Sequence, residues 1–260
     1  MCFDTDSHPP IAPMAGAAVA HEHLALTASD GTVVPAFAAQ AGAGPSPAAM
    51  LILPDVRGLH TYYEELALRF AEAGIDALAL DYFGRTAPNA QRGEGFDHAP
   101  YIAQVRWDEL QADIAAGAAQ LRAGGERALF TVGFCFGGRL SLLTPTLPGL
   151  RVSGAVGFYG WPVGASRGGV PAPADVAADN RAPVLAIFGG ADQGITSDLV
   201  AAYEAALQAA GAAREVVTEP GAPHSFFDRK QAEFADASAD AWRRVLAFVA
   251  RNTPGAAAAL

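Results

Sequence analysis

A cysteine lies in the middle of a turn framed by glycines, at residues 133–137 (Gly-Phe-Cys-Phe-Gly). Small residues two places before and two places after Cys135 let the chain turn sharply and hold the central side chain above a sheet. The segment that follows reads as a helix, whose N-terminus directs N–H groups and partial positive charge at the sulfur and so favours the thiolate. The pattern predicts a nucleophile. The alternative is a small buried cysteine beside a tight turn.

A nucleophile needs a base, and the base needs a group that orients it. Asp192 ends a glycine-rich loop after the apolar run 185–188, and His224 lies on a loop just after the last predicted strand. An isolated loop aspartate is usually a cap or turn residue, and an isolated histidine is usually a surface or core group. Here all three residues follow predicted strands, at the ends where the active residues of parallel sheets gather. The sequence therefore predicts that Cys135, His224 and Asp192 act together.

Apolar strands alternate with helices along most of the chain, which indicates a mostly parallel central sheet with helices on both faces. Ser29-Asp30-Gly31 predicts a turn between two short strands at 21–26 and 32–37. Further strands are expected at 50–53, 76–80, 128–132, 154–158, 184–188 and 215–218, and helices at 63–73, 105–122, 197–210 and 231–251. The segment 84–100 is polar, contains Gly and Pro, and is expected to be irregular.

Composition divides the chain into three parts. Residues 1–20 are rich in Pro and Ala and show no period, so we expect an N-terminal arm that lies on the surface. Residues 21–252 are expected to form a single α/β domain, and 253–260 a disordered tail.

The bulk numbers exclude several classes of partner. The chain has 260 residues and a formal net charge of −10, without a basic run, so nucleic acid and anionic membrane surfaces would repel it. Cys2 and Cys135 do not make a disulfide framework, and the N-terminus lacks the basic and apolar regions of a signal peptide. No apolar run reaches the roughly 20 residues that span a bilayer. We expect a cytoplasmic protein, and the sequence leaves open whether it is a homodimer.

Four segments resemble the dienelactone hydrolase family of the α/β-hydrolase fold. They are Gly-Phe-Cys-Phe-Gly-Gly at 133–138, Phe-Gly-Gly-Ala-Asp at 188–192, Pro-His-Ser-Phe at 223–226 and Leu-Pro-Asp-Val-Arg-Gly-Leu at 53–59. The similarity runs from about residue 24 to about residue 250. It implies that a Cys135–His224–Asp192 triad hydrolyses an ester or lactone through a thioester acyl-enzyme.

The resemblance also implies an oxyanion hole and a group that supports the nucleophile. The backbone N–H groups of Val56 and Phe136 would form the hole, and Asp55 stands where the family has a glutamate that contacts the nucleophile. Aspartate is one methylene shorter, so its reach to the sulfur differs from that of the family's residue.

Substrate-binding residues follow from the same resemblance. Arg85 matches a family arginine that grips a substrate carboxylate, a role suited to the two parallel N–H groups of a guanidinium. The family's second arginine falls near Arg229, with Asp228 inserted close to its place. Arg57 could supply positive charge instead, and Tyr159 and Trp161 could form the floor of an apolar pocket.

No cofactor or metal is expected. The chain has no phosphate-binding glycine motif, and His21, His23 and His60 lack neighbouring ligands at the spacing of a zinc site. The expected partner is a small-molecule ester or lactone. Two alternatives keep the same fold: a general carboxylesterase or thioesterase, and a non-catalytic binder of small molecules, against which the intact triad argues.

Overall fold

A computed structural model describes residues 3–4, 6–15, 17, 19–87, 92–93 and 95–255 of the chain. Cys2 and the residues 256–260 of the predicted tail lie outside the described residues.

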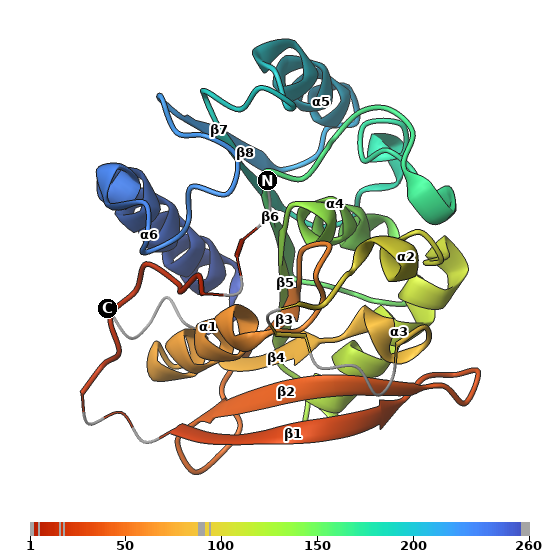
Figure 1. The fold of residues 1–260 in the computed structure, drawn as a ribbon, viewed down its shortest axis with the longest axis vertical. Helices are drawn as coiled ribbons and strands as arrows, with labels where there is room; N and C mark the ends of the chain where they lie inside the picture. Colours follow the sequence, from red (N-terminus) through yellow and green to blue (C-terminus); the bar gives the residue numbers. More distant parts are fainter. Residues whose placement is uncertain are drawn as a thin grey trace.

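The molecule is built on an eight-stranded sheet with the strand order β1-β2-β4-β3-β5-β6-β7-β8 (Figure 1). β1 pairs with β2 and β2 with β4 in the antiparallel sense, and all strands from β3 to β8 run parallel. The hairpin predicted around Ser29-Asp30-Gly31 is thus confirmed, as is the mostly parallel sheet. The strands are β1 (Val19–Thr27), β2 (Val33–Ala41), β3 (Ala48–Leu53), β4 (Asp76–Leu80), β5 (Ala128–Phe134), β6 (Gly154–Phe158), β7 (Val184–Gly189) and β8 (Arg214–Glu219).

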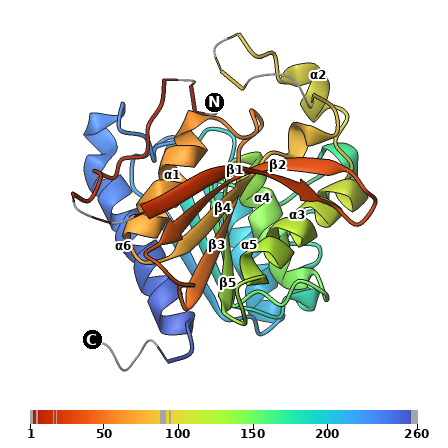
Figure 2. The same ribbon diagram turned by 90° about the horizontal axis from the view of Figure 1, so that it is seen from below.

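Helices cover both faces of the sheet. α1 and α6 lie on one face, and α3 and α4 lie on the other (Figures 1 and 2). The helices are α1 (Thr61–Glu72), α2 (Ala99–Ile102), α3 (Trp107–Arg122), α4 (Phe136–Leu143), α5 (Ser197–Ala209) and α6 (Ala235–Asn252). None of the helices in the described part of the chain is both long and apolar enough to cross a membrane.

The period of two along the central strands explains why both faces are covered. In β3, Met50 and Ile52 pack into the cluster that contains α1 and α6 side chains, such as Leu66 and Phe248. Leu51 and Leu53 point the other way, into the cluster that contains α3 and α4 side chains. All six residues of β3 are buried. A strand that is apolar on both faces therefore has a core on each side.

Two segments differ from the sequence-based expectation. The segment expected to be irregular, 84–100, overlaps the start of the short helix α2, which begins at Ala99 and has Pro100 in its first turn, where proline is tolerated. The N-terminal arm is not confined to the surface. Phe3 and Ser7 are only 2% and 1% exposed, and Val19 and Ala20 already belong to β1. Phe3 is buried because an aromatic cluster accepts its ring.

Candidate active site

The turn at Cys135 connects β5 directly to α4. Cys135 has φ 54° and ψ −113°, a left-handed backbone conformation that is strained for a residue with a Cβ. A Cβ added to Gly133 would lie 1.9 Å from the carbonyl oxygen of Gly137, and one added to Gly137 would lie 2.0 Å from that of Leu53. The two glycines allow backbones to approach that closely, as the motif predicted. The N–H of Cys135 donates to the carbonyl of Phe158 at 3.0 Å, which ties the turn to β6.

Asp192 and His224 form a short hydrogen bond. Nδ1 of His224 lies 2.6 Å from Oδ2 of Asp192, and Oδ1 of Asp192 accepts the N–H groups of Gly194 and Ile195. Burial alone would raise the pKa of Asp192, but the hydrogen bond and charge of His224 and the two N–H groups outweigh it and hold this pKa below its usual value. The carboxylate therefore stays ionised and orients the ring. With Nδ1 taken, Nε2 is the nitrogen available to a nucleophile.

The order of the strands brings the predicted triad to one edge of the sheet. β5, β6, β7 and β8 are neighbours, and the residues that follow their carboxyl ends are Cys135, Tyr159, Asp192 and His224. The His224 ring packs against Tyr159 and Trp161, with ring centroids 4.9 Å and 5.5 Å away. Trp161 also lines the same cavity as Cys135. The histidine and the cysteine thus share an aromatic wall.

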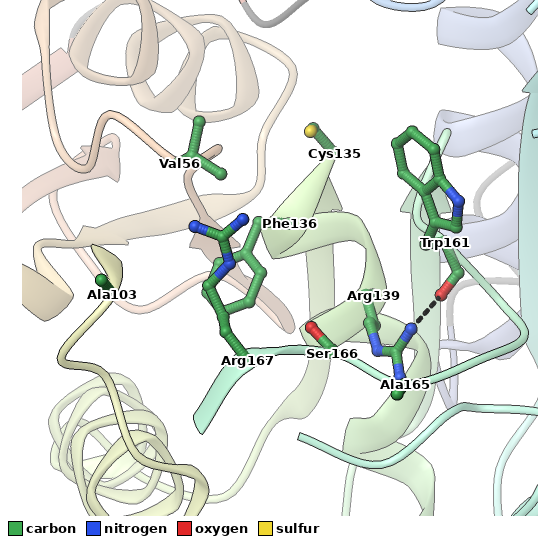
Figure 3. A pocket seen from close by; sticks show the side chains of 9 residues that line it. All are labelled: Val56, Ala103, Cys135, Phe136, Arg139, Trp161, Ala165, Ser166 and Arg167. Carbon is green, nitrogen blue, oxygen red and sulfur yellow. Dashed lines mark hydrogen bonds between the residues drawn. The ribbon is translucent and has the colours of Figure 1, made fainter. Parts of the chain in front are cut away.

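Cys135 opens into a cavity of about 610 Å³ (Figure 3). The sulfur lies between Val56 on one side and Trp161 on the other. Phe136 is the first residue of α4, so its N–H has no partner within the helix, and Val56 lies on the loop after β3. Both residues predicted for the oxyanion hole therefore border the cavity. The lining residues are Val56, Ala103, Cys135, Phe136, Arg139, Trp161, Ala165, Ser166 and Arg167.

Asp55 is fully buried behind this wall rather than among the lining residues. Its Oδ1 accepts the N–H of Arg57 at 2.8 Å, its Oδ2 accepts the N–H of Phe3 at 3.2 Å, and its own N–H donates to Oη of Tyr63 at 2.9 Å. Burial raises the pKa of Asp55 to about 6, against the opposing effect of these hydrogen bonds and of the Arg57 charge. The carboxylate thus bonds to backbone on both sides.

The structure does not bring Arg85 to the cavity. Its guanidinium is held by Asp113, with Nη2–Oδ1 at 2.7 Å, and by Asp30, with Nη1–Oδ2 at 2.5 Å. Asp113 is 1% exposed, so the pair belongs to the packing of α3 against the β1–β2 turn. The resemblance implied that Arg85 binds a substrate carboxylate, but in the structure its guanidinium already binds the carboxylate of Asp113.

The other predicted substrate residues lie around the site rather than in the cavity wall. Arg57 pairs with Asp4 at 3.2 Å and lines a neighbouring cavity of about 350 Å³. The backbone N–H of Arg229 donates to the carbonyl of His8 at 2.9 Å, so this segment is bound to the N-terminal arm. Tyr159 is fully buried, and its ring supports His224. Trp161 is 39% exposed and lines the cavity itself.

Arg167 is a cavity residue that the sequence reasoning missed. It lies in the long segment between β6 and β7, and its guanidinium points across the cavity toward Val56 (Figure 3). Arg139 fixes this segment to α4 by donating to the carbonyl oxygens of Trp161, Gly164, Val170 and Pro171 at 2.7–3.2 Å. No periodic pattern marks the segment, so its sequence carried no signal that Arg167 would face the nucleophile.

The described residues contain no group of three His, Cys, Asp or Glu side chains arranged to hold a metal ion. His21 and His23 instead pack against Phe37, with ring centroids 5.6 Å and 5.1 Å away.

Comparison with known proteins identifies the family of the chain. The dienelactone hydrolase family matches residues 34–253. A provisionally named carboxymethylenebutenolidase of Methylorubrum extorquens is 33% identical over 224 residues, covering 82% of this chain and 75% of its own. One from Salmonella typhimurium is 32% identical over 231 residues, covering 86% of this chain and 84% of its own. The crystal structure of a provisionally named dienelactone hydrolase from Klebsiella pneumoniae superposes with a TM-score of 0.77 at 29% identity, covering 90% of this chain and 99% of its own.

Proposed function

Since this chain belongs to the dienelactone hydrolase family and is a hydrolase of ester or lactone bonds, we propose that it works through Cys135, His224 and Asp192 by way of a thioester. The observation that carries the proposal is the strained cysteine at the cavity wall. A residue with a Cβ is held in the left-handed region only where the surrounding structure enforces it, and such positions cluster at active sites. The 2.6 Å contact between His224 and Asp192 supplies the oriented base that the thiol needs.

The first half of the reaction forms the thioester. His224 takes the thiol proton on Nε2, and the sulfur of Cys135 bonds to the substrate's carbonyl carbon. The negative charge that develops on the carbonyl oxygen is stabilised by the N–H groups of Phe136 and Val56, and losing one such donor typically costs about 3–4 kcal/mol. The carbon–oxygen bond of the ester then breaks. The leaving oxygen takes the proton from Nε2, which leaves the acyl group on the sulfur.

The second half releases the acid. A water molecule gives its proton to Nε2 of His224 as its oxygen bonds to the thioester carbon. The same two N–H groups stabilise the second oxyanion. Its collapse breaks the carbon–sulfur bond, and the thiolate recovers the proton from His224. Asp192 stays ionised throughout, because hydrogen bonds hold its pKa below the usual value.

The chemistry of sulfur favours an activated substrate. A thiolate is a better leaving group than an ordinary alkoxide, so a tetrahedral intermediate with a poor leaving group would expel the sulfur again. An enol or phenol leaves readily, which makes an enol-lactone or another activated ester the preferred substrate class. We assign the grip on a substrate's anionic group to Arg167, because its guanidinium faces the cavity and makes no ion pair with any described residue.

Replacement of Cys135 by alanine tests the proposed function. We expect Cys135→Ala to reduce hydrolysis of an activated aryl acetate to the uncatalysed rate. Mass spectrometry of the wild-type protein, quenched during turnover, should find the acetyl group on the peptide that contains Cys135. Cys2→Ala is the matched control, because it removes the only other thiol of the chain and should retain activity. Normal turnover by Cys135→Ala would refute the proposal.

A further inference from the structure

We propose that the N-terminal arm is a working part of the active site, in which Phe3 is a positioning residue that holds Asp55 and, through it, the Val56 N–H of the oxyanion hole. The inference rests on the proposed function in taking Cys135 as the nucleophile and Val56 as an oxyanion donor. It adds to the site a segment that precedes the region matched by the family, residues 34–253.

The ring of Phe3 is inserted among aromatic side chains beneath the site. It is 2% exposed and stacks on Tyr62 with centroids 4.0 Å apart and planes 20° apart. The ring centroids of Tyr63, Phe134 and Tyr159 lie 6.3 Å, 5.8 Å and 6.3 Å from that of Phe3. Phe134 directly precedes the nucleophile, and Tyr159 supports His224. The arm therefore inserts Phe3 into the layer of side chains that underlies the proposed triad.

The backbone of Phe3 contacts the loop that carries the oxyanion donor. Its N–H donates to Oδ2 of Asp55, while Oδ1 of the same carboxylate accepts the N–H of Arg57. A side chain that bonds to the N–H two residues further on fixes the backbone between them, as in an Asx turn. The residue between them is Val56. The Phe3 N–H thus holds Oδ2 of Asp55, while Oδ1 of the same carboxylate fixes the backbone at Val56.

Several contacts fasten the rest of the arm. Nδ1 of His8 lies 2.9 Å from Oε2 of Glu65 on α1, and the backbone of His8 bonds to Asp228 and Arg229, just after the loop of the catalytic histidine. Asp6 pairs with Lys230 at 2.6 Å. In Figure 2 the arm runs beside α1 to the end of the molecule where α2 lies. The arm therefore joins α1, the Asp55 loop and the segment after His224.

Electrostatics makes each donor to Asp55 important. The carboxyl is fully buried, and burial raises its pKa to about 6, so near neutral pH it is an anion without water. The charged and titratable groups that face it are Arg57 on its own loop and Tyr62 and Tyr63 on α1, with Asp4 of the arm paired to Arg57. When the ring no longer anchors the arm, the Phe3 N–H moves away, and Oδ2 of Asp55 is left without a hydrogen-bond donor among the described residues. The Asp55 loop should then rearrange, because an unpaired buried anion is costly.

Two reactions of the same thiol separate positioning of the oxyanion hole from general damage. Iodoacetamide alkylates a thiolate at a saturated carbon, so no oxyanion forms, whereas an aryl acetate acylates it through one. In a Cys2→Ala background, which leaves Cys135 as the sole thiol, we expect Phe3→Ala to slow acylation about tenfold or more while alkylation changes less than about twofold. Both variants keep the backbone N–H of residue 3. Phe3→Ala removes the ring that holds the arm in the aromatic cluster and so displaces this N–H from Asp55, whereas Phe3→Leu keeps most of the apolar bulk and should restore most of the acylation rate.

Controls and a double-mutant cycle complete the test. Ile11→Ala removes another apolar arm contact that does not involve Asp55, and should change neither rate. Adding Phe3→Ala to Asp55→Asn should slow acylation much less than it does in the parent, because Phe3 acts through Asp55. Equal slowing of both reactions, or unchanged acylation in a folded Phe3→Ala protein, would overturn the inference. Absence of acylation at Cys135 in the parent protein would instead refute the proposed function.

Discussion

Arg85 and Arg167 differ in whether carboxylates of the protein already neutralise their charge. Arg85 binds the buried carboxylate of Asp113 with Nε and Nη2, and it binds Asp30 with Nη1. Arg167 lies at the cavity with no ion pair among the described residues. A guanidinium can bind a substrate carboxylate only if no internal carboxylate competes for it. The two residues therefore have different expected roles, structural for Arg85 and substrate-binding for Arg167.

The corresponding alanine variants should behave in opposite ways. We expect Arg167→Ala to raise KM for an acidic enol-lactone about tenfold, because it removes a charge-assisted contact, with little change for a neutral aryl ester. Arg85→Ala should leave the ratio of kcat/KM for the two substrates unchanged. It should lower the free energy of unfolding by about 3 kcal/mol, because it leaves Asp113 buried without its partner.

Steady-state kinetics on both substrates and urea unfolding measure these effects. Loss of the preference for the acidic substrate in Arg85→Ala but not in Arg167→Ala would show that the assignment is reversed. Equal losses on acidic and neutral substrates in Arg167→Ala would favour a general carboxylesterase or thioesterase without a requirement for a carboxylate.

The two arginines also show what could be predicted from the sequence at this scale. Cys135 could be found because the whole motif lies within five consecutive residues, although the carbonyl of Leu53, against which Gly137 lies, comes from a distant strand. Arg85 was assigned by its match to a family arginine, and nothing in the sequence indicated that Asp113, 28 residues later, would claim it. Arg167 could not be found, because its direction depends on four carbonyl oxygens that accept from Arg139.

At the scale of elements, the connection from β3 to α1 contains two buried groups with opposite pKa shifts. Burial raises the pKa of Asp55 from 3.8 to about 6, and it lowers the pKa of His60 from 6.5 to about 4. Neither ring nitrogen of His60 has a hydrogen-bond partner among the residues that the structure describes, and the residue is 5% exposed. Each group thus prefers its neutral form in the fold.

The two shifts act on stability with opposite sign. Between pH 4 and 6.5 the unfolded chain protonates His60 and the folded chain does not, so this contribution to stability is lost as the pH falls. Between pH 3.8 and 6 the folded chain keeps the proton of Asp55 and the unfolded chain has released it, so this contribution is lost as the pH rises. Each slope is about 1.4 kcal/mol per pH unit, and from about pH 4 to 6 they largely cancel.

A variant that lacks one of the two groups should show the pH dependence of unfolding free energy that the missing group cancels in the wild type. Relative to the wild type, His60→Phe should gain about 1.4 kcal/mol of unfolding free energy for each unit that the pH falls from 6 to 4, and Asp55→Asn should lose the same amount. Urea unfolding at pH 4, 5 and 6 gives the differences, in which the other titrating groups cancel. Variant and wild-type curves that run parallel across this range would contradict the assignment of both pKa shifts.

The elements themselves were largely predictable, and the exceptions have a common cause. Strands such as 50–53 and 76–80 are apolar on both faces, a pattern that only a sheet covered on both sides explains. The N-terminal arm has no period at all. Its course depends on single contacts, such as Phe3 on Tyr62 and His8 on Glu65, with partners more than fifty residues away. Local pattern cannot carry information of that kind.

At the scale of the whole molecule, the proposed catalytic residues and a buried ion pair lie at opposite ends of the sheet's strands. The proposed triad residues Cys135, Asp192 and His224 follow the carboxyl ends of strands. Asp76 and Arg127 pair at the opposite, amino ends of β4 and β5 at 2.5 Å. Their side chains are 5% and 7% exposed. Asp76 also accepts the N–H groups of Ala41 and Ser46, which gathers β2 and the start of β3 at the same place. This cluster fixes strand ends that lie far from the substrate.

Asp76→Ala should therefore destabilise the protein without changing catalysis. We expect a loss of about 3–5 kcal/mol in unfolding free energy, because Arg127 would stay buried without its counter-charge. kcat and KM should be unchanged at a temperature where the variant is folded. Asp240→Ala is the matched control. It removes a carboxylate that pairs with two arginines near the surface, and should cost less than about 1 kcal/mol. A fall in kcat for folded Asp76→Ala would show that the two ends of the sheet are coupled.

The way in which Arg139 holds the segment 161–171 has a consequence for protein engineering. All its acceptors are main-chain carbonyl oxygens, which every amino acid possesses, so the anchor tolerates new side chains along the segment it secures. A randomised library at 165–167 could therefore vary the wall opposite the nucleophile while α4 stays in register. Directed evolution of new ester specificities would begin at these positions and keep Arg139 invariant.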